Sequence, residues 1–230
     1  MSLIIKIKNL TKDFPIGGRT FTALKNINFE VGTGEFAGFV GPSGSGKTTL
    51  LNIIGSLDMP TRGEAVVLGQ SVGGLSSIEA SRLRSRHLGF IFQTYNLLPV
   101  YTAFENVEFP LLLLKMPVTQ RKKAVMEALE WVGLEDRSGS RPIQMSGGEC
   151  QRVAIARAMV KKPEIVLADE PTANLDAKNS HHILKTMQNL NAELKTTFLF
   201  ATHDEKVIHY LERKIHLMDG QIESDEMVIR

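Results

Sequence analysis

A glycine-rich segment in the N-terminal part of the chain reads Gly41-Pro42-Ser43-Gly44-Ser45-Gly46-Lys47-Thr48-Thr49. It fits the pattern G-x-x-x-x-G-K-[ST], the phosphate-binding P-loop. Residues 36–40 form a short apolar run typical of a buried parallel strand, and residues 49–54 have the apolar spacing of a helix. An ordinary Gly/Ser turn before a helix is the alternative, but such a turn does not require Lys47 and Thr48 in register. The segment therefore predicts a nucleoside triphosphate site.

Each part of the segment has an expected role in binding phosphate. Glycines let successive backbone N–H groups turn toward a polyphosphate, and the following helix adds the positive end of its dipole. We expect Lys47 to reach the β- and γ-phosphates as a point charge and the Thr48 hydroxyl to bind Mg²⁺.

Length and composition limit the class of protein. The 230 residues allow one large α/β domain, and 43% hydrophobic with 23% charged residues is typical of a soluble globular protein. A net charge of +2 argues against nucleic acid as the main partner, and the basic run 121–123 is expected to be the solvated first turn of a helix. One cysteine excludes a disulfide framework and a multi-cysteine zinc site, and it suits a reducing cytoplasm. We expect neither a secretory signal nor a membrane span, so another chain would supply any span.

The pattern of elements predicts an α/β fold. We expect a P-loop NTPase core, a mostly parallel sheet with helices on both faces, plus an N-terminal antiparallel β subdomain and an inserted α-helical subdomain. Residues 4–8 and 22–31 alternate like antiparallel strands, with a loop at 14–18 between them. In this interpretation 1–230 is a single domain, in which 94–160 is the helical subdomain and 1–93 with 161–230 forms the nucleotide-binding core with the antiparallel β subdomain.

Four of the predicted strands end in polar residues or in the glycine-rich segment. They end at Gly41, at Gln93, at Asp169 with Glu170, and at His203. Ligands of open α/β sheets bind at the carboxyl ends of the strands, so these side chains are expected to converge on one site.

The two adjacent carboxylates have different predicted roles. Asp169 follows the apolar run 165–168 and can hold Mg²⁺ beside Thr48, directly or through water. Pro171 stops the strand just after Glu170, so the two carboxylates must diverge. Glu170 is then free to polarise an attacking water as general base. The alternative for Glu170 is a strand-end charge that faces solvent.

His203 and Gln93 have weaker signals. A hydrogen bond from His203 to the γ-phosphate or to the water would stabilise charge as it develops, whereas a lone strand-end histidine is usually structural. The Gln93 amide can complete the magnesium or water shell and report γ-phosphate occupancy to the helical subdomain. The alternative for Gln93 is an ordinary polar residue in the turn that follows a strand.

A second pair of glycines opens a helix at Ser146-Gly147-Gly148-Glu149. Ser146 and Glu149 form a capping-box pattern, and the glycines leave the N–H groups of the helix start open to an anion. A well-capped helix is the simple alternative. One nucleotide does not need two phosphate cradles in one chain, however. In a head-to-tail two-fold dimer, this segment of each protomer can close over the nucleotide on the P-loop of the other.

Taken in order, these motifs resemble those of the ATP-binding cassette family over almost the whole chain. They are the P-loop 41–48, the Q-loop Gln93, the signature 145–151, the Walker B strand 165–169 followed by Glu170, the D-loop 173–176 and the switch His203. The resemblance implies an ATP sandwich homodimer that drives integral membrane permease subunits on separate chains. It also implies a cross-dimer contact for Asp176, in addition to the role of that residue as a helix N-cap.

Three features depart from the usual family pattern. The signature reads Met-Ser-Gly-Gly-Glu-Cys-Gln where Leu-Ser-Gly-Gly-Gln is commoner, and Cys150 is expected to be a surface thiol. Ala173 stands in the D-loop where near relatives often have glycine. The adenine-stacking aromatic, usually Tyr, would be Phe14, which keeps a ring face but loses the hydroxyl; packing is its alternative role.

The segment after Gln93 resembles the LolD/MacB type, the branch of lipoprotein release, macrolide or peptide export and mechanotransmission. Tyr95, Leu97 and Leu98 are expected either to dock a membrane partner or to pack in the core. An FtsE-type cell-division ATPase is the close rival, and a soluble non-transport cassette ATPase is the more distant one. We expect ATP as substrate, Mg²⁺ as cofactor, no nucleic-acid partner, and a cytoplasmic, peripheral position on the inner face of the cell membrane.

Overall fold

The apolar strand before the P-loop lies inside a six-stranded sheet in the computed structural model, which describes residues 2–228. This strand, β3 (Phe36–Val40), is buried along its whole length. The sheet has the order β10-β9-β3-β8-β7-β6 and is parallel except for β10. The other strands are β6 (Leu88–Ile91), β7 (Ile165–Asp169), β8 (Thr197–Thr202), β9 (Arg213–Met218) and β10 (Gln221–Met227). The four strands that end in the predicted site residues are thus adjacent, as expected.

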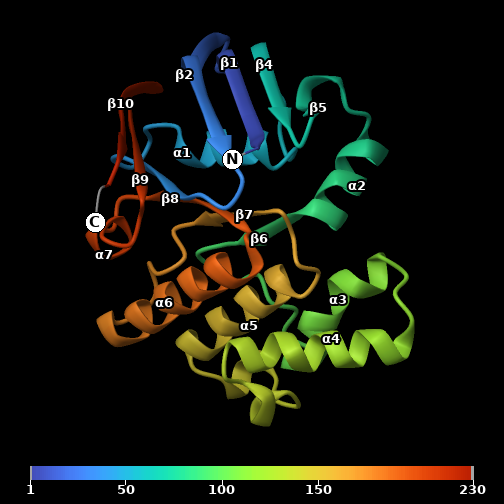
Figure 1. Ribbon diagram of the computed structural model, residues 1–230. Coiled ribbons are helices and arrows are strands. Elements are labelled where there is room, and N and C mark those ends of the chain that lie inside the picture. Colours follow the sequence, from blue (N-terminus) through green and yellow to red (C-terminus); the bar gives the residue numbers. More distant parts are fainter. Residues whose placement is uncertain (1, 229–230) are drawn as a thin grey trace.

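A four-stranded antiparallel sheet lies above the six-stranded sheet (Figure 1). It contains β1 (Leu3–Ile16), β2 (Arg19–Gly32), β4 (Arg62–Val67) and β5 (Gln70–Ser71). The loop expected at 14–18 is wrong, because β1 continues to Ile16 and Phe14 pairs with Phe21. Only Gly17 and Gly18 form the turn, with φ values of 54° and 75°. Two consecutive positive φ angles suit a two-residue hairpin, and glycine adopts them without strain.

Helices cover both faces of the six-stranded sheet. They are α1 (Lys47–Ile54), α2 (Ser77–His87), α3 (Ala103–Leu113), α4 (Val118–Trp131), α5 (Gly147–Met159), α6 (Ala177–Leu194) and α7 (Glu205–Ile208), with short 3₁₀ turns at Val72–Gly74, Glu135–Arg137 and Pro142–Gln144. Figure 1 shows α5 and α6 below the sheet and α3 with α4 at the lower right. The α/β fold class is therefore confirmed.

Strand β8 separates two hydrophobic cores. Phe198 and Phe200 pack with Phe36 and with the buried faces of α5 and α6. Leu199 and Ala201 point to the opposite face, where α1 and the antiparallel sheet cover them. Successive side chains of a strand face opposite sides, so burial on both faces explains why this strand is apolar throughout.

The basic run at the start of α4 is not simply solvated. Arg121 donates from Nε to Glu108 Oε1 at 2.8 Å and from Nη1 to the Met116 carbonyl at 2.7 Å. Lys122 and Lys123 are exposed, as expected. The expectation was wrong for Arg121, because its guanidinium can satisfy a carboxylate on α3 and the carbonyl of the connecting turn together. The arginine therefore fixes α4 against α3.

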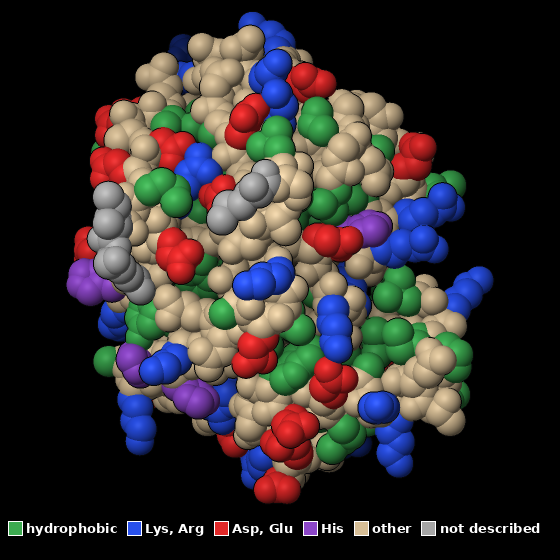
Figure 2. Space-filling model, viewed as in Figure 1, with side chains coloured by type: hydrophobic (Ala, Val, Ile, Leu, Met, Phe, Trp, Pro, Cys, Tyr) green, Lys and Arg blue, Asp and Glu red, His purple; other side chains and the backbone are tan. Residues whose placement is uncertain are grey.

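On the face shown in Figure 2, basic and acidic side chains are interspersed, and hydrophobic side chains gather at the lower right, over α3. Across residues 2–228, no helix combines the length and apolar character that crossing a bilayer requires.

Candidate active site

The P-loop connects β3 to α1, and its glycines pack closely against the backbone of β9 and β2. A Cβ on Gly41 would lie 2.0 Å from the Leu217 carbonyl oxygen, and one on Gly46 would lie 2.9 Å from the Ala23 carbonyl oxygen. Gly46 also has a φ of 105° where it begins α1. Only glycine fits these two positions. The predicted loop therefore has the close backbone approach that a phosphate cradle needs.

Lys47 is held inside this loop. Its ammonium donates to the Gly41 carbonyl at 2.7 Å and to the Pro42 carbonyl at 2.8 Å. Burial lowers the pKa of Lys47, and the carboxylates of Glu170 and Asp169 act in the opposite direction. A desolvated cation that faces a glycine-rich turn suits a polyanion, because phosphate oxygens can replace the carbonyls as acceptors.

Asp169, at the end of β7, faces Thr48 at the start of α1. The Thr48 hydroxyl lies 3.1 Å from both carboxylate oxygens of Asp169. Burial raises the pKa of Asp169, and the hydrogen bond from Thr48 opposes this shift. A hydroxyl and a desolvated carboxylate are hard oxygen donors of the kind that Mg²⁺ prefers. Among residues 2–228 no cluster of three His, Cys, Asp or Glu side chains is arranged to hold a metal ion.

Glu170 turns away from Asp169, as expected from the sequence. It has a φ of 45°, and its N–H donates to the Ala201 carbonyl of β8 at 2.9 Å. Its Oε1 lies 2.5 Å from His203 Nδ1, and its Oε2 accepts from the Thr202 hydroxyl at 2.9 Å. Positive φ is unusual for a side chain other than glycine and is a local strain that the surrounding bonds must support. The two carboxylates therefore have separate partners.

Most of the P-loop lines one pocket of about 570 Å³ together with the other predicted strand-end residues, Gln93, Asp169, Glu170 and His203, whereas Gly41, Pro42 and Ser45 do not line it. Gln93 is exposed at its rim, and its carbonyl accepts from Asn174 Nδ2 at 2.9 Å. Phe14 also lines the pocket, with the Lys12 ammonium 4.9 Å from its ring centroid. The pocket is lined by Phe14, Phe21, Ala23, Ser43, Gly44, Gly46, Lys47, Thr48, Thr49, Gln93, Asp169, Glu170 and His203.

Ser146, Gly147, Gly148 and Glu149 do not line this pocket in the same chain. Ser146 caps α5: its hydroxyl accepts from the Glu149 N–H at 3.3 Å, and Glu149 Oε2 accepts from the Ser146 N–H at 2.8 Å. The capping box is therefore present, and the carboxylate bond lowers the pKa of Glu149. The predicted second phosphate cradle lies apart from the P-loop of its own chain.

Asp176 occupies the predicted N-cap of α6. Its Oδ1 accepts from the Asn179 N–H at 2.8 Å, and its Oδ2 accepts from Asn179 Nδ2 at 2.7 Å. These hydrogen bonds lower the pKa of Asp176. A Cβ on Gly148 would lie 2.7 Å from Asn179 Oδ1, so the start of α6 packs directly on the glycines that open α5.

Comparison with known proteins identifies the family. A family model described as ABC transporter matches residues 24–173.

The chain belongs to the ABC transporter family.

Its P-loop, paired carboxylates and strand-end histidine make it the ATPase cassette of that family. It is 44% identical over 227 residues to the uncharacterized ABC transporter ATP-binding protein MJ0796 of Methanocaldococcus jannaschii, covering 97% of each chain.

Solved structures of ABC cassettes have the same fold. A dimeric post-hydrolysis state of MJ0796 with ADP and Pi matches with a TM-score of 0.91 and 42% identity, covering 99% of this chain and all of that one. A second dimeric MJ0796 structure matches equally well, at 43% identity. The cbiO1 cassette of Clostridium perfringens matches with a TM-score of 0.90 at 28% identity, over 99% of this chain and 89% of that one.

The cysteine of the ABC signature helix is buried, which corrects the expectation of a surface thiol. Cys150 is only 7% exposed, and its Sγ lies 3.6 Å from the Pro142 carbonyl. Burial and the neighbouring Glu149 charge raise the pKa of the Cys150 thiol. The residue lies on the inner face of α5, because the turn at Pro142–Gln144 folds back over it. A protonated, covered thiol is chemically inert.

Two residues of the cassette site were missed from the sequence. Phe21 lies across the hairpin from Phe14, lines the same pocket and is 53% exposed. Thr202, next to His203, contacts Glu170. An exposed aromatic directly opposite Phe14 could be recognised only once the two strands were known to pair. Thr202 is one of two threonines in β8, and nothing in the sequence distinguishes it from Thr197.

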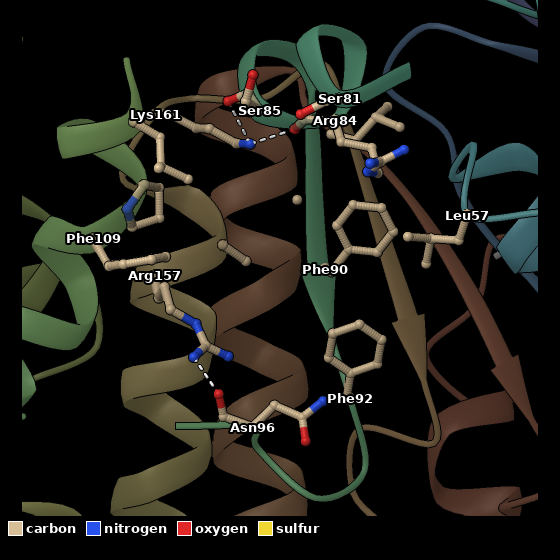
Figure 3. Close-up of a pocket in the computed structure, with 15 residues that line it drawn as sticks. Leu57, Ser81, Arg84, Ser85, Phe90, Phe92, Asn96, Phe109, Arg157 and Lys161 are labelled. Atoms are coloured by element: carbon tan, nitrogen blue, oxygen red, sulfur yellow. Dashed lines mark hydrogen bonds between the residues drawn. The ribbon is translucent and has the colours of Figure 1, made fainter. Parts of the chain in front are cut away.

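The cassette also has an apolar groove between α2, β6, α3 and α5, with a volume of about 420 Å³. Figure 3 shows Phe90 and Phe92 on one side of the groove and Phe109 on the other. Leu113 of α3 lines it and is 62% exposed. The segment after Gln93 borders the groove through Asn96. Of the three residues proposed as a docking patch or core, Leu97 packs on the hydrophobic core, Tyr95 is half-buried and Leu98 is exposed.

Proposed function

We propose that this ABC ATPase hydrolyses Mg-ATP with Glu170 as general base. The observation that carries the proposal is the divergence of the two carboxylates at the end of β7. Asp169 faces Thr48, where Mg²⁺ and the phosphates would lie, while Glu170 faces His203. One carboxylate then binds the cation, and the other accepts the proton of the attacking water.

The remaining pocket residues bind and orient ATP in this proposal. The backbone of 41–49 and Lys47 hold the β- and γ-phosphates, while Gln93 completes the magnesium or water shell. His203 is 56% exposed at the rim, so its ring can turn toward the γ-phosphate and stabilise the charge that develops there. Phe14 stacks on adenine, and the Lys12 ammonium lies over the Phe14 ring.

Two protomers form each complete site. Ser146–Glu149 lie outside the P-loop pocket of their own chain, and they form a capped helix start that opens with two glycines. A head-to-tail homodimer brings this segment onto the partner's nucleotide and brings Asp176 to the dimer contact. Both MJ0796 structures are dimeric, which supports this arrangement. In it, 94–160 acts as the signature subdomain, and 1–93 with 161–230 acts as the nucleotide-binding core.

The groove is the proposed contact for separate integral membrane subunits. Leu57, Phe109 and Leu113 leave large apolar areas open beside the segment that follows Gln93. Exposed apolar surface next to a nucleotide-contacting loop suits a helix of a partner that must sense ATP. The cassette then works peripherally at the inner face of the membrane.

The segment after Gln93 favours export, lipoprotein release or mechanotransmission over import. An FtsE-like role in cell division is the second candidate, because the same segment resembles that group. A soluble cassette ATPase that has no membrane partner is the third.

The test is capture of the partner by Glu170→Gln protein from solubilised native membranes with ATP. We expect this variant to bind ATP, to hydrolyse it at least ~100-fold more slowly because the base is lost, and to retain an integral protein. The matched variant Glu170→Gln/Leu113→Asp should bind ATP equally but lose that partner, since a charge in the groove opposes apolar docking.

A captured protein with few spans and a large extracytoplasmic domain supports export or lipoprotein release, and one linked to a cell-wall hydrolase supports cell division. Hydrolysis by Glu170→Gln at the wild-type rate contradicts the base assignment, and a cassette that captures no membrane protein contradicts the transporter role.

A further inference from the structure

The two oxygens of Glu170 have different kinds of partner. Oε1 faces His203, whose ring is 56% exposed, at 2.5 Å. Oε2 faces the hydroxyl of Thr202, which is fully buried at the end of β8, at 2.9 Å. A side chain at the pocket rim can move when ligand binds, whereas a buried β-branched residue on a strand has a fixed rotamer. The stable contact of the carboxylate is therefore the one with Thr202.

The direction of the hydrogen bonds around Thr202 is forced. The Asp204 N–H points at the same hydroxyl oxygen at 3.0 Å, and a backbone N–H can only donate. Thr202 therefore accepts from Asp204 and gives its single proton to Glu170. With His203 Nδ1–H as the second donor, both oxygens of Glu170 act as acceptors, which is the state that a general base needs before reaction.

A second threonine also links the turn after β7 to the end of β8, and here the donor comes from the β7 side. Thr172, also buried, donates from its hydroxyl to Asp204 Oδ2 at 3.2 Å. Together with the Glu170 N–H bond to Ala201, these contacts join the turn after β7 to the end of β8. They support the positive φ of Glu170, so the direction of its side chain is set by β8.

We propose that Thr202 is a positioning residue for hydrolysis, whose hydroxyl holds Glu170 Oε2 so that Oε1 stays directed at the attacking water when His203 turns to the γ-phosphate. This rests on the proposed role of Glu170 as base. A carboxylate that is held by His203 alone would lose its orientation at the moment when the histidine changes partner. Orientation of a base within its reaction geometry contributes to the rate of the chemical step, but not to ATP affinity.

The test compares kcat and KM for ATP in Thr202→Val, Thr202→Ser and Thr202→Ala. Valine keeps the shape of threonine and removes the hydroxyl, so kcat should fall roughly 10- to 100-fold while KM stays within about 2-fold. Alanine should show the same loss, which separates hydroxyl loss from a packing effect of valine. Serine keeps the donor and should restore most of kcat.

Thr197→Val is the matched control. Thr197 is equally buried at the other end of β8, and its hydroxyl accepts from the Gly34 N–H at 2.8 Å, away from the pocket. Its loss should leave kcat unchanged. A wild-type kcat in Thr202→Val, a loss in Thr197→Val as large as that in Thr202→Val, or a failure of serine to rescue would each overturn the proposal. If the wild-type protein itself does not hydrolyse ATP, the proposed function fails as well, which the wild-type rate shows directly.

Discussion

At the scale of single residues, the two neighbouring carboxylates of the site have different hydrogen-bond partners. Asp169 and Glu170 are adjacent in the chain, yet their carboxylates bond to α1 and to β8, respectively. After burial, the Glu170 charge also raises the pKa of Asp169, because like charges disfavour ionisation. Their separation lets one hold a cation while the other accepts a proton.

Lys47→Ala tests the phosphate site at this scale. The ammonium is desolvated and faces the loop, so its removal should weaken ATP binding roughly 10- to 100-fold, the value of one charged hydrogen-bonding partner. Titration with a fluorescent ATP analogue measures the change. Lys123→Ala, at an exposed position of α4, is the control and should bind like the wild type. Unchanged affinity in Lys47→Ala would refute the assignment.

At the scale of elements, helix α5 and the turn after it each contribute one half-buried cation that binds a neighbouring segment. Arg157 donates to the carbonyls of Tyr95 and Asn96 at 2.7 and 2.6 Å, and both of these residues have positive φ (59° and 48°). Figure 3 shows the bond from Arg157 to Asn96 at the edge of the groove. These two hydrogen bonds attach the signature helix to the segment that follows Gln93.

Lys161 attaches the end of this helical region to α2. Its ammonium donates to the carbonyls of Arg84 and Ser85 at 2.7 and 2.8 Å, as drawn in Figure 3. Burial lowers the pKa of Lys161 to about 8, and the Glu164 charge opposes that shift. A cation near the last carbonyls of a helix is a favourable C-terminal partner, although here it must be desolvated to reach them.

Lys161 predicts a pH dependence of stability. The unfolded chain keeps this proton up to the ordinary lysine range, whereas the folded chain releases it near pH 8. Between these values the unfolded state binds more protons, so the free energy of unfolding should rise with pH. Relative to Lys161→Met, the rise should total at most about 3 kcal/mol. Urea unfolding of both proteins at about pH 7.5, 9 and 10.5 measures it, and a difference that is independent of pH would contradict the prediction.

At the scale of the whole molecule, each chain has one P-loop and one signature segment that do not meet. The six-stranded sheet and its two cores hold the P-loop pocket, while α5 begins outside that pocket. A single chain therefore contains the parts of a complete site but not their assembly. Two copies related by a two-fold axis supply both halves twice.

Mixing of two inactive variants tests this assembly. Lys47→Ala damages the P-loop and Ser146→Arg blocks the signature segment, so each alone should lose most of its ATPase activity. A heterodimer of the two retains one site with an intact Lys47 from one protomer and an intact Ser146 from the other. The mixture should recover roughly a quarter of the wild-type activity if the variants pair at random and each site works independently. The specific activity of the wild-type protein should also fall on dilution, because the dimer dissociates. Two results would show that the chain acts alone. One is no recovery on mixing, and the other is a specific activity that stays constant down to concentrations at which only monomer is present.

The sequence by itself predicted the parts of the site that depend on short, contiguous patterns. The P-loop glycines, the Asp169–Glu170 pair and the caps at Ser146 and Asp176 were all found this way. Backbone geometry, strand alternation and helix capping act over a few residues, and the strand ends meet because parallel strands share one edge.

The tertiary structure decided which side chains those patterns contact. The pairing of Phe14 with Phe21, the burial of Cys150, the ion pair of Arg121 and the bond from Thr202 to Glu170 each join segments that lie apart in the chain. The last one depends on the register of β7 against β8, which pairs Asp169 with Ala201. A shift by one residue would turn the Thr202 hydroxyl to the opposite face of the sheet, and no local pattern determines that register.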